Sequence, residues 1–209
     1  MKEYTFAIDK WQAQWIFAPV RSKLSIIKLL MRTVKVMLVN AAVDEKDTTG
    51  KIILRVSKMS RIFYYSENKY FSIQFPFSVT ESDDGLRFYS SHIDRIDSKV
   101  TSEVLSIVTN SNVFDAPEPL DFIEPVDEIF DSNPNFWEFL RSLLLFEGGY
   151  VRYDYDIIHT KDKVHPLNHV DVFYSSNSTF KLGIHSRIPL ESMIDCLDLE
   201  SDCHFLDTK

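Results

Sequence analysis

Apolar and polar residues alternate with two different periods along this chain. Residues 22–39 carry apolar side chains at helical spacing, and Ser22 is placed to cap that helix. Residues 98–109 repeat the helical pattern, whereas residues 70–79 alternate apolar and polar side chains, as in a strand with one buried face. Pro76 cannot donate a backbone hydrogen bond, so it places this strand at a sheet edge or ends its pairing.

Turn residues and caps complete the list of expected elements. A helix is expected from a cap at Asn133, with Pro134 in its first turn, to Gly148, which follows its last turn. The remaining strands are expected at 52–56, 61–65, 86–90, 150–158, 168–175 and 179–185, with a last helix at 190–197. The pattern predicts an α+β fold, in which an antiparallel sheet has helices packed on one side and the N-terminal helix covers part of the core.

Residues 115–131 form the clearest boundary in the sequence. They contain seven acidic residues, three prolines and no basic residue, which is typical of a linker or loop. We therefore expect an N-terminal α+β part at 1–114, the acidic linker or loop at 115–131, and a C-terminal part at 132–209 with a helix, a meander and a short helix. The whole is expected to form one globular unit.

Charge is distributed unevenly over the 209 residues. The net charge of −8 combines +7 in residues 1–69 with −15 in residues 70–209. Either the two parts pack on each other, or the basic part faces a polyanion such as nucleic acid. The basic helix at 22–39 is rather apolar for a solvated nucleic-acid reader, which favours a core role. A protein partner is expected.

Several functional classes are disfavoured by what the chain lacks. The longest apolar stretch, residues 24–43, is interrupted by Lys28, Arg32 and Lys35, so no membrane contact is expected. No signal peptide is evident and there are only two cysteines, so a cytoplasmic location is expected. Gly-rich phosphate loops, GxSxG, CxxC and dinucleotide fingerprints are all missing from the sequence.

The three C-terminal strands concentrate the polar residues with chemical potential. If an antiparallel meander buries the apolar faces of all three strands, its register can shift only by an even number of residues. The intervening polar residues must then lie together on the opposite face. These are Arg152, Asp154, Asp156, His169, Asp171, Lys181 and His185.

Two kinds of role are open for this face. Asp154, Asp156, His169 and Asp171 are the candidate ligands of a divalent metal and the candidate catalytic residues, with His165 as a loop ligand or proton donor. Arg152, Lys181 and His185 are the candidate contacts to a phosphate or a partner. Alternatively, the face is simply the solvated side of the sheet, with cross-strand ion pairs.

The segments GYVRYDYD, HPLNHVDVFY and FKLGIHSRIPLESMIDCL support one comparison with known proteins. Over residues 149–198 they resemble the C-terminal part of a bacterial family catalogued as a domain of unknown function. The shared pattern is a Tyr/Arg-rich strand, His-Pro-x-x-His, a further strand, then Pro and a short helix. The resemblance implies a bacterial setting and a defence role as expectations, and it assigns no catalytic residues.

Two functional hypotheses follow from the sequence. The first is an accessory or interaction component of a bacterial defence or toxin–antitoxin-type system that acts through a protein partner. The alternative is a metal-dependent nuclease or phosphodiesterase that uses the face with Asp154, Asp156, His169 and Asp171. A divalent metal is the only cofactor that the sequence suggests.

Overall fold

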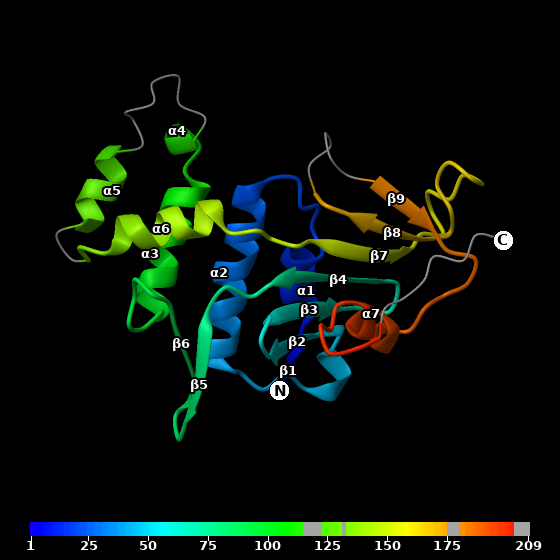
Figure 1. The fold of residues 1–209 in the computed structure, drawn as a ribbon, viewed down its shortest axis with the longest axis horizontal. Coiled ribbons are helices and arrows are strands. Elements are labelled where there is room, and N and C mark those ends of the chain that lie inside the picture. Colours follow the sequence, from blue (N-terminus) through cyan, green and yellow to red (C-terminus); the bar gives the residue numbers. More distant parts are fainter. Residues whose placement is uncertain (115–122, 131–132, 175–179, 203–209) are drawn as a thin grey trace. The chain divides into compact units, whose positions relative to one another are not determined.

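The computed structural model describes residues 1–114, 123–130, 133–174 and 180–202. The chain forms two compact units, each assembled from segments on both sides of the predicted acidic boundary (Figure 1). The first unit contains Met1–Phe17, Asp44–Gln74 and Gly149–Lys209, and the second contains Ala18–Val43 and Phe75–Gly148. The sequence had suggested a division at 115–131. Of those residues, 115–122 and 131 lie outside the described chain, and the helix α5 (Ile123–Phe130) occupies the rest.

The first unit is built on a seven-stranded antiparallel sheet in the order β1-β2-β3-β4-β7-β8-β9. Together with the helices, this sheet confirms the predicted α+β class. The link between the N-terminal and C-terminal strands is the pairing of β4 with β7. The strands are β1 (Lys2–Ile8), β2 (Gly50–Val56), β3 (Arg61–Tyr65), β4 (Lys69–Gln74), β7 (Val151–Tyr155), β8 (Asn168–Val172) and β9 (Phe180–Gly183).

Helices contact both faces of this sheet. On the face that we call the α7 face, Tyr70 and Tyr153 stack and pack against Met193 of α7 (Leu190–Cys196). On the α1 face, Phe71 makes an edge-to-face contact with Phe17, which follows α1 (Lys10–Ile16). The sequence had predicted helices on one side only. Both faces of the central strands are apolar, so both are covered.

The β1 strand and the α1 helix were not predicted from the sequence. The exposed positions of β1 are Lys2, Glu3, Thr5 and Ala7, and its buried residues are only Phe6 and Ile8. α1 is short, and it begins with a capping box in which the Asp9 carboxylate accepts from the backbone of Gln12 while the Gln12 side chain accepts from the backbone of Asp9. A helix of only seven residues provides too little periodicity to be recognised from the sequence.

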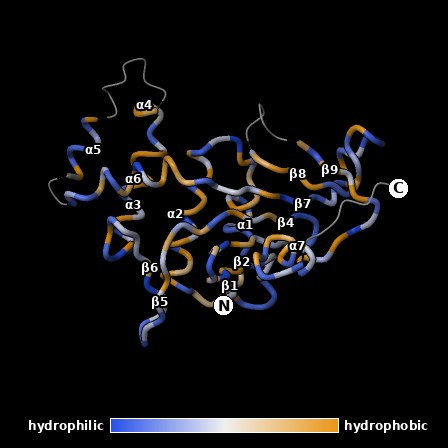
Figure 2. Tube along the Cα trace, viewed as in Figure 1, coloured by the Kyte–Doolittle hydropathy of each residue, from blue (hydrophilic) through white to orange (hydrophobic). Residues whose placement is uncertain are grey.

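The second unit is mainly helical. The predicted helix at 22–39 is confirmed as α2 (Lys23–Val39), with the Ser22 hydroxyl accepting from the Ser25 backbone at 3.1 Å. Its hydrophobic stretches are visible in Figure 2, and eight of its residues are buried, so it is a core helix. α2 contacts α3 (Ser98–Thr109), α6 (Phe136–Leu145) and the strand β6 (Gly85–Tyr89). The short helix α4 (Ser111–Phe114) follows α3.

Two boundaries in this unit differ from the prediction. The expected strand at 70–79 is divided at Pro76 into β4 and β5 (Ser78–Ser82), and β5 pairs with β6 instead of extending the large sheet. The helix expected from Asn133 begins at Phe136, because Pro134 and Asn135 form a turn before it. Along the described chain, no helix has both the length and the apolar character needed to cross a membrane.

Candidate functional site

Strands β7, β8 and β9 lie side by side at one end of the sheet (Figure 1) and bring the predicted polar residues together. Arg152 pairs with Asp171, which in turn pairs with Lys181, while Asp154 pairs with His169. Arg152 also pairs with Phe71, so all five polar side chains belong to the α1 face. The prediction that these five residues share one face of the sheet is thus confirmed.

Arg152 is the centre of the cluster. Its Nε donates to Asp154 Oδ2 at 2.6 Å, and a terminal nitrogen donates to Asp171 Oδ2. A second terminal nitrogen donates to the Tyr150 hydroxyl at 3.3 Å. Burial by itself would lower the pKa of Arg152, but the neighbouring Tyr150, Asp154 and Asp171 oxygens outweigh it and raise that pKa above its ordinary value. The guanidinium therefore remains a permanent counter-charge for two carboxylates.

The contacts of His169 hold its ring in place. Its side chain is buried, and Nδ1 lies 2.8 Å from the backbone oxygen of Pro166. A carbonyl oxygen can only accept, so Nδ1 carries the proton and donates it. Nε2 faces the Lys181 ammonium at 3.2 Å, and it also lies 3.5 Å from Asp154 Oδ2 and 4.0 Å from Asp171 Oδ2. His169 is thus anchored through Nδ1, and its Nε2 points toward the charged groups of the cluster.

Asp156 and His185 do not share the strand face as predicted, because both lie beyond the ends of their strands. Asp156 follows β7 and accepts from the backbone nitrogens of Ile158 at 3.1 Å and His159 at 2.9 Å, which closes a turn. It also contacts His165 Nε2 at 3.0 Å. His185 is exposed in the bend after β9 and takes no part in the contacts described for the cluster.

The environment of Asp156 favours its ionised form. Burial would raise its pKa, but the backbone N–H of His159 and the rings of His165 and His159 outweigh that effect and lower the pKa well below its usual range. Asp156 therefore acts as a fixed anion that orients the His165 ring. This connects the loop 156–167 to the cluster, since His165 Nδ1 lies 3.1 Å from the Lys181 ammonium.

Tyr150 and Lys69 belong to the cluster, although the sequence did not indicate them. Lys69 pairs with Asp154 across β4 and β7, and its ammonium donates to the backbone oxygen of Phe17 at 3.3 Å. Burial and the nearby Arg152 charge lower the pKa of Lys69. Burial raises the pKa of Tyr150. Only the pairing of β4 with β7, which is remote in sequence, brings Lys69 here.

The cluster is buried on β8 and open to solvent on β9. His169 is fully buried and Asp171 is 6% exposed, whereas Lys181 and the rest of β9 are exposed, so only part of this face is the solvated surface that the sequence left as an alternative. Buried charges must be compensated, and here Arg152 and Lys181 supply positive charge to Asp154 and Asp171. One oxygen is poorly satisfied: Asp171 Oδ1 is buried without a hydrogen bond, and the Lys181 ammonium lies 3.5 Å away.

The donor set is chemically suited to a divalent cation. One ligand atom each from Asp154, His169 and Asp171 lies within 4.8 Å of the others. Oxygen and imidazole ligands suit zinc, manganese and iron. However, Arg152 already binds one oxygen of each carboxylate. A metal held by both aspartates would therefore have to compete with the guanidinium.

A separate cleft lies between α7 and the strands β1 and β2. Its volume is about 340 Å³, and Ile53 and Leu190 form an apolar floor, each 4% exposed. The full lining is Glu3, Lys51, Ile53, Arg55, Leu190, Glu191, Ile194, Asp195 and Asp198. The signal available in the sequence was the acidic run 190–202, which has five carboxylates and no lysine or arginine.

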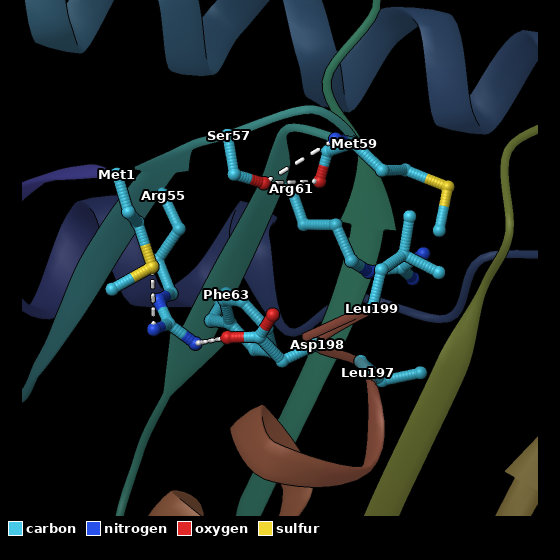
Figure 3. A pocket seen from close by; sticks show the side chains of 9 residues that line it. All are labelled: Met1, Arg55, Ser57, Met59, Arg61, Phe63, Leu197, Asp198 and Leu199. Carbon is cyan, nitrogen blue, oxygen red and sulfur yellow. Dashed lines mark hydrogen bonds and ion pairs between the residues drawn. The ribbon is translucent and has the colours of Figure 1, made fainter. Parts of the chain in front are cut away.

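Next to this cleft is a much smaller hollow around Arg55 (Figure 3). Arg55 contacts Asp198 at 3.3 Å and Glu3 at 3.3 Å, and it donates to Met1 Sδ at 2.8 Å. The hollow has a volume of about 10 Å³, the space of roughly one water molecule. It cannot admit a substrate, so Arg55 is part of the wall of the larger cleft.

Comparison with known proteins identifies no family model, no curated protein and no solved structure that matches this chain. The resemblance of residues 149–198 to a bacterial family therefore remains an expectation. Function is argued below from the geometry of the cluster and the cleft.

Proposed function

We propose that this protein is a binding component that acts through a protein partner, and that a basic segment of the partner occupies the cleft between α7 and β1–β2. The observation that carries this proposal is the acidic lining of this cleft. Four carboxylates line it against two cationic side chains, Lys51 and Arg55. Complementary charge guides encounter and fixes register, while the apolar floor contributes affinity.

The cations of the cleft are already engaged within the protein, which supports a basic ligand. Arg55 forms ion pairs with Glu3 and Asp198. Lys51 lies over the ring of Tyr65, with 5.4 Å between the ammonium and the ring centroid. The remaining carboxylates in the lining, Glu191 and Asp195, are exposed on α7. A segment that carries lysine or arginine beside an apolar residue fits these features.

The test is quantitative capture of partners from the native host with three forms of the protein. The cleft variant is Glu191→Lys with Asp195→Lys, and the control is Asp83→Lys with Asp84→Lys in the β5–β6 turn, which changes the net charge equally. We expect one protein, retained by the wild type and the control at moderate salt, to be lost from the cleft variant. A photo-crosslinker at position 191 should then label a lysine- or arginine-rich segment of that protein.

Two outcomes contradict the proposal. Recovery of no specific partner at moderate salt would remove the binding function itself. Equal retention of a partner by the cleft variant, shown by circular dichroism to be folded, would move the binding surface elsewhere. The expected setting is the bacterial defence or toxin–antitoxin-type system that the resemblance implies.

A second candidate function is metal-assisted hydrolysis of a phosphodiester. The grouping of Asp154, His169 and Asp171 favours it, because a metal there could activate a water or polarise a phosphoryl oxygen. Metal analysis of protein purified without chelator, together with hydrolysis of bis(p-nitrophenyl) phosphate in the presence of manganese or zinc, tests it. Activity that is lost in His169→Ala and Asp171→Ala would favour catalysis over partner binding. A metal-free, inactive protein would remove this candidate.

A further inference from the structure

The ammonium of Lys181 lies at the meeting point of three metal-type donor atoms. Its Nζ is 3.1 Å from His165 Nδ1, 3.2 Å from His169 Nε2 and 3.5 Å from Asp171 Oδ1. Two imidazoles and one carboxylate form the donor set of many zinc sites, in which a water fills the fourth position. The Lys181 side chain is 35% exposed, so the position communicates with solvent.

The two histidines are oriented as metal ligands are. A ligating histidine usually has its second ring nitrogen bonded to a carboxylate or a backbone carbonyl, which aims the free lone pair. Here Asp156 Oδ2 lies 3.0 Å from His165 Nε2, and the Pro166 carbonyl accepts from His169 Nδ1 at 2.8 Å. The nitrogens left over, His165 Nδ1 and His169 Nε2, are the two that face the Lys181 ammonium.

Asp171 is likewise held through one atom while a second donor atom is left for a ligand. Its Oδ2 accepts from Arg152, which fixes the carboxylate plane, while Oδ1 is buried without a hydrogen bond. The side chain is only 8% exposed, and a buried carboxylate oxygen without a hydrogen bond is uncommon. The Lys181 ammonium lies 3.5 Å from Oδ1, which is an ion-pair distance. Oδ1 is thus directed toward the same point as the two histidine nitrogens, with capacity for a closer ligand.

We propose that the Lys181 ammonium occupies the position of a zinc-type divalent metal held by His165, His169 and Asp171, and that Lys181 moves out to solvent when the metal binds. The donors lie about 1 Å farther from this point than zinc ligands do. Metal binding therefore requires His165, on the loop 156–167, to approach His169 and Asp171 on β8. The ligand set differs from the one predicted from sequence: Asp156 supports a ligand, and Asp154 remains bound to Arg152. This inference concerns metal binding alone: it shares His169 and Asp171 with the hydrolytic candidate but does not require hydrolysis, and it is independent of partner binding.

The first test is titration with zinc chloride after removal of metal by chelator, with cobalt(II) absorption as a probe of tetrahedral coordination. Wild-type protein should bind one equivalent, and Lys181→Met should bind it at least tenfold more tightly, because no ammonium competes. His165→Ala and Asp171→Asn should lose the site. His159→Ala is the matched control, since His159 contacts Asp156 but not Lys181, and it should retain zinc. Wild-type binding no stronger than that of His165→Ala would overturn the proposal, whatever Lys181→Met does.

The second test measures release of Lys181 and remains informative if a ligand variant fails to fold. Wild-type protein is treated briefly with an amine-reactive ester, with and without zinc chloride, and modification of each lysine is measured by mass spectrometry. Zinc should increase modification of Lys181 severalfold and leave that of Lys46, an exposed lysine far along the chain, unchanged. Zinc binding without a change at Lys181 would place the metal elsewhere and refute the inference. Binding and release without phosphodiester hydrolysis would support it while removing the catalytic candidate.

Discussion

Replacement of Arg152 by Met should cost more stability than any other single change in the polar cluster. Arg152 holds two carboxylates, and the side chains of Asp154 and Asp171 are only 13% and 8% exposed. Removing one partner of a buried ion pair leaves an uncompensated charge, which typically costs about 3–5 kcal/mol. Lys181 remains near Asp171 and offsets part of this cost, while Asp154 loses the cation that binds it most closely. We therefore expect a loss of about 3–5 kcal/mol in the free energy of unfolding.

Arg141→Met is the matched control for this prediction. Arg141 pairs with Glu138 at 2.6 Å, the same distance as the Arg152–Asp154 contact, but its side chain is 54% exposed. Exposed pairs contribute about 0–1 kcal/mol. The difference between the losses in free energy of unfolding for Arg152→Met and Arg141→Met therefore measures the effect of burial at the same pairing distance. Arg152→Lys should fall between them, because lysine keeps the charge but cannot contact both carboxylates with a planar fork.

The assay is urea denaturation followed by tryptophan fluorescence and by circular dichroism, with thermal melting as a second measurement. For a chain of this size, a loss of 3–5 kcal/mol lowers Tm by roughly 6–20 °C. A loss below about 1 kcal/mol for Arg152→Met, equal to that of the exposed control, would refute the reasoning. It would mean that Asp154 and Asp171 do not depend on the guanidinium for their charge balance.

Three further substitutions should each lower the free energy of unfolding, and urea denaturation measures each loss. Gly149→Ala should lower the free energy of unfolding by about 1–2 kcal/mol. Gly149 has φ +52°, and a Cβ there would lie 3.1 Å from a guanidinium nitrogen of the buried Arg61. Unchanged stability would show that the turn relaxes freely. Tyr153→Phe should cost about 1–3 kcal/mol, since it removes the 2.7 Å hydrogen bond to Asn168 Oδ1 inside the core; a neutral result would mean that water replaces the hydroxyl. Asp97→Ala should cost about 1 kcal/mol, because the Asp97 carboxylate caps α3 through two backbone N–H groups; if stability is retained, another group must cap the helix.

Local sequence patterns were sufficient to predict several helices and strands. The helical spacing and the Ser22 cap located α2 to within one residue at its N-terminus. The strands expected at 61–65 and from residue 70 are found as β3 and β4, which form a hairpin closed by the Ser66 backbone N–H donating to the Lys69 carbonyl. Side chains alternate strictly along a strand, so the shared face of Arg152, Asp154, His169, Asp171 and Lys181 also followed from the sequence once antiparallel pairing was assumed.

Long-range packing decided the rest. The sequence could not show that β4 pairs with β7, because register between distant strands depends on the whole core and not on either segment alone. It could not show that His169 and Asp171 are buried, since alternation places a side chain on a face but does not say what covers that face. The histidine loop over Lys181 and the acidic cleft beside α7 likewise arise where separate segments meet. Sequence therefore determined which residues share a face, while tertiary structure determined which of them are desolvated, and desolvation is what gives the cluster its chemistry.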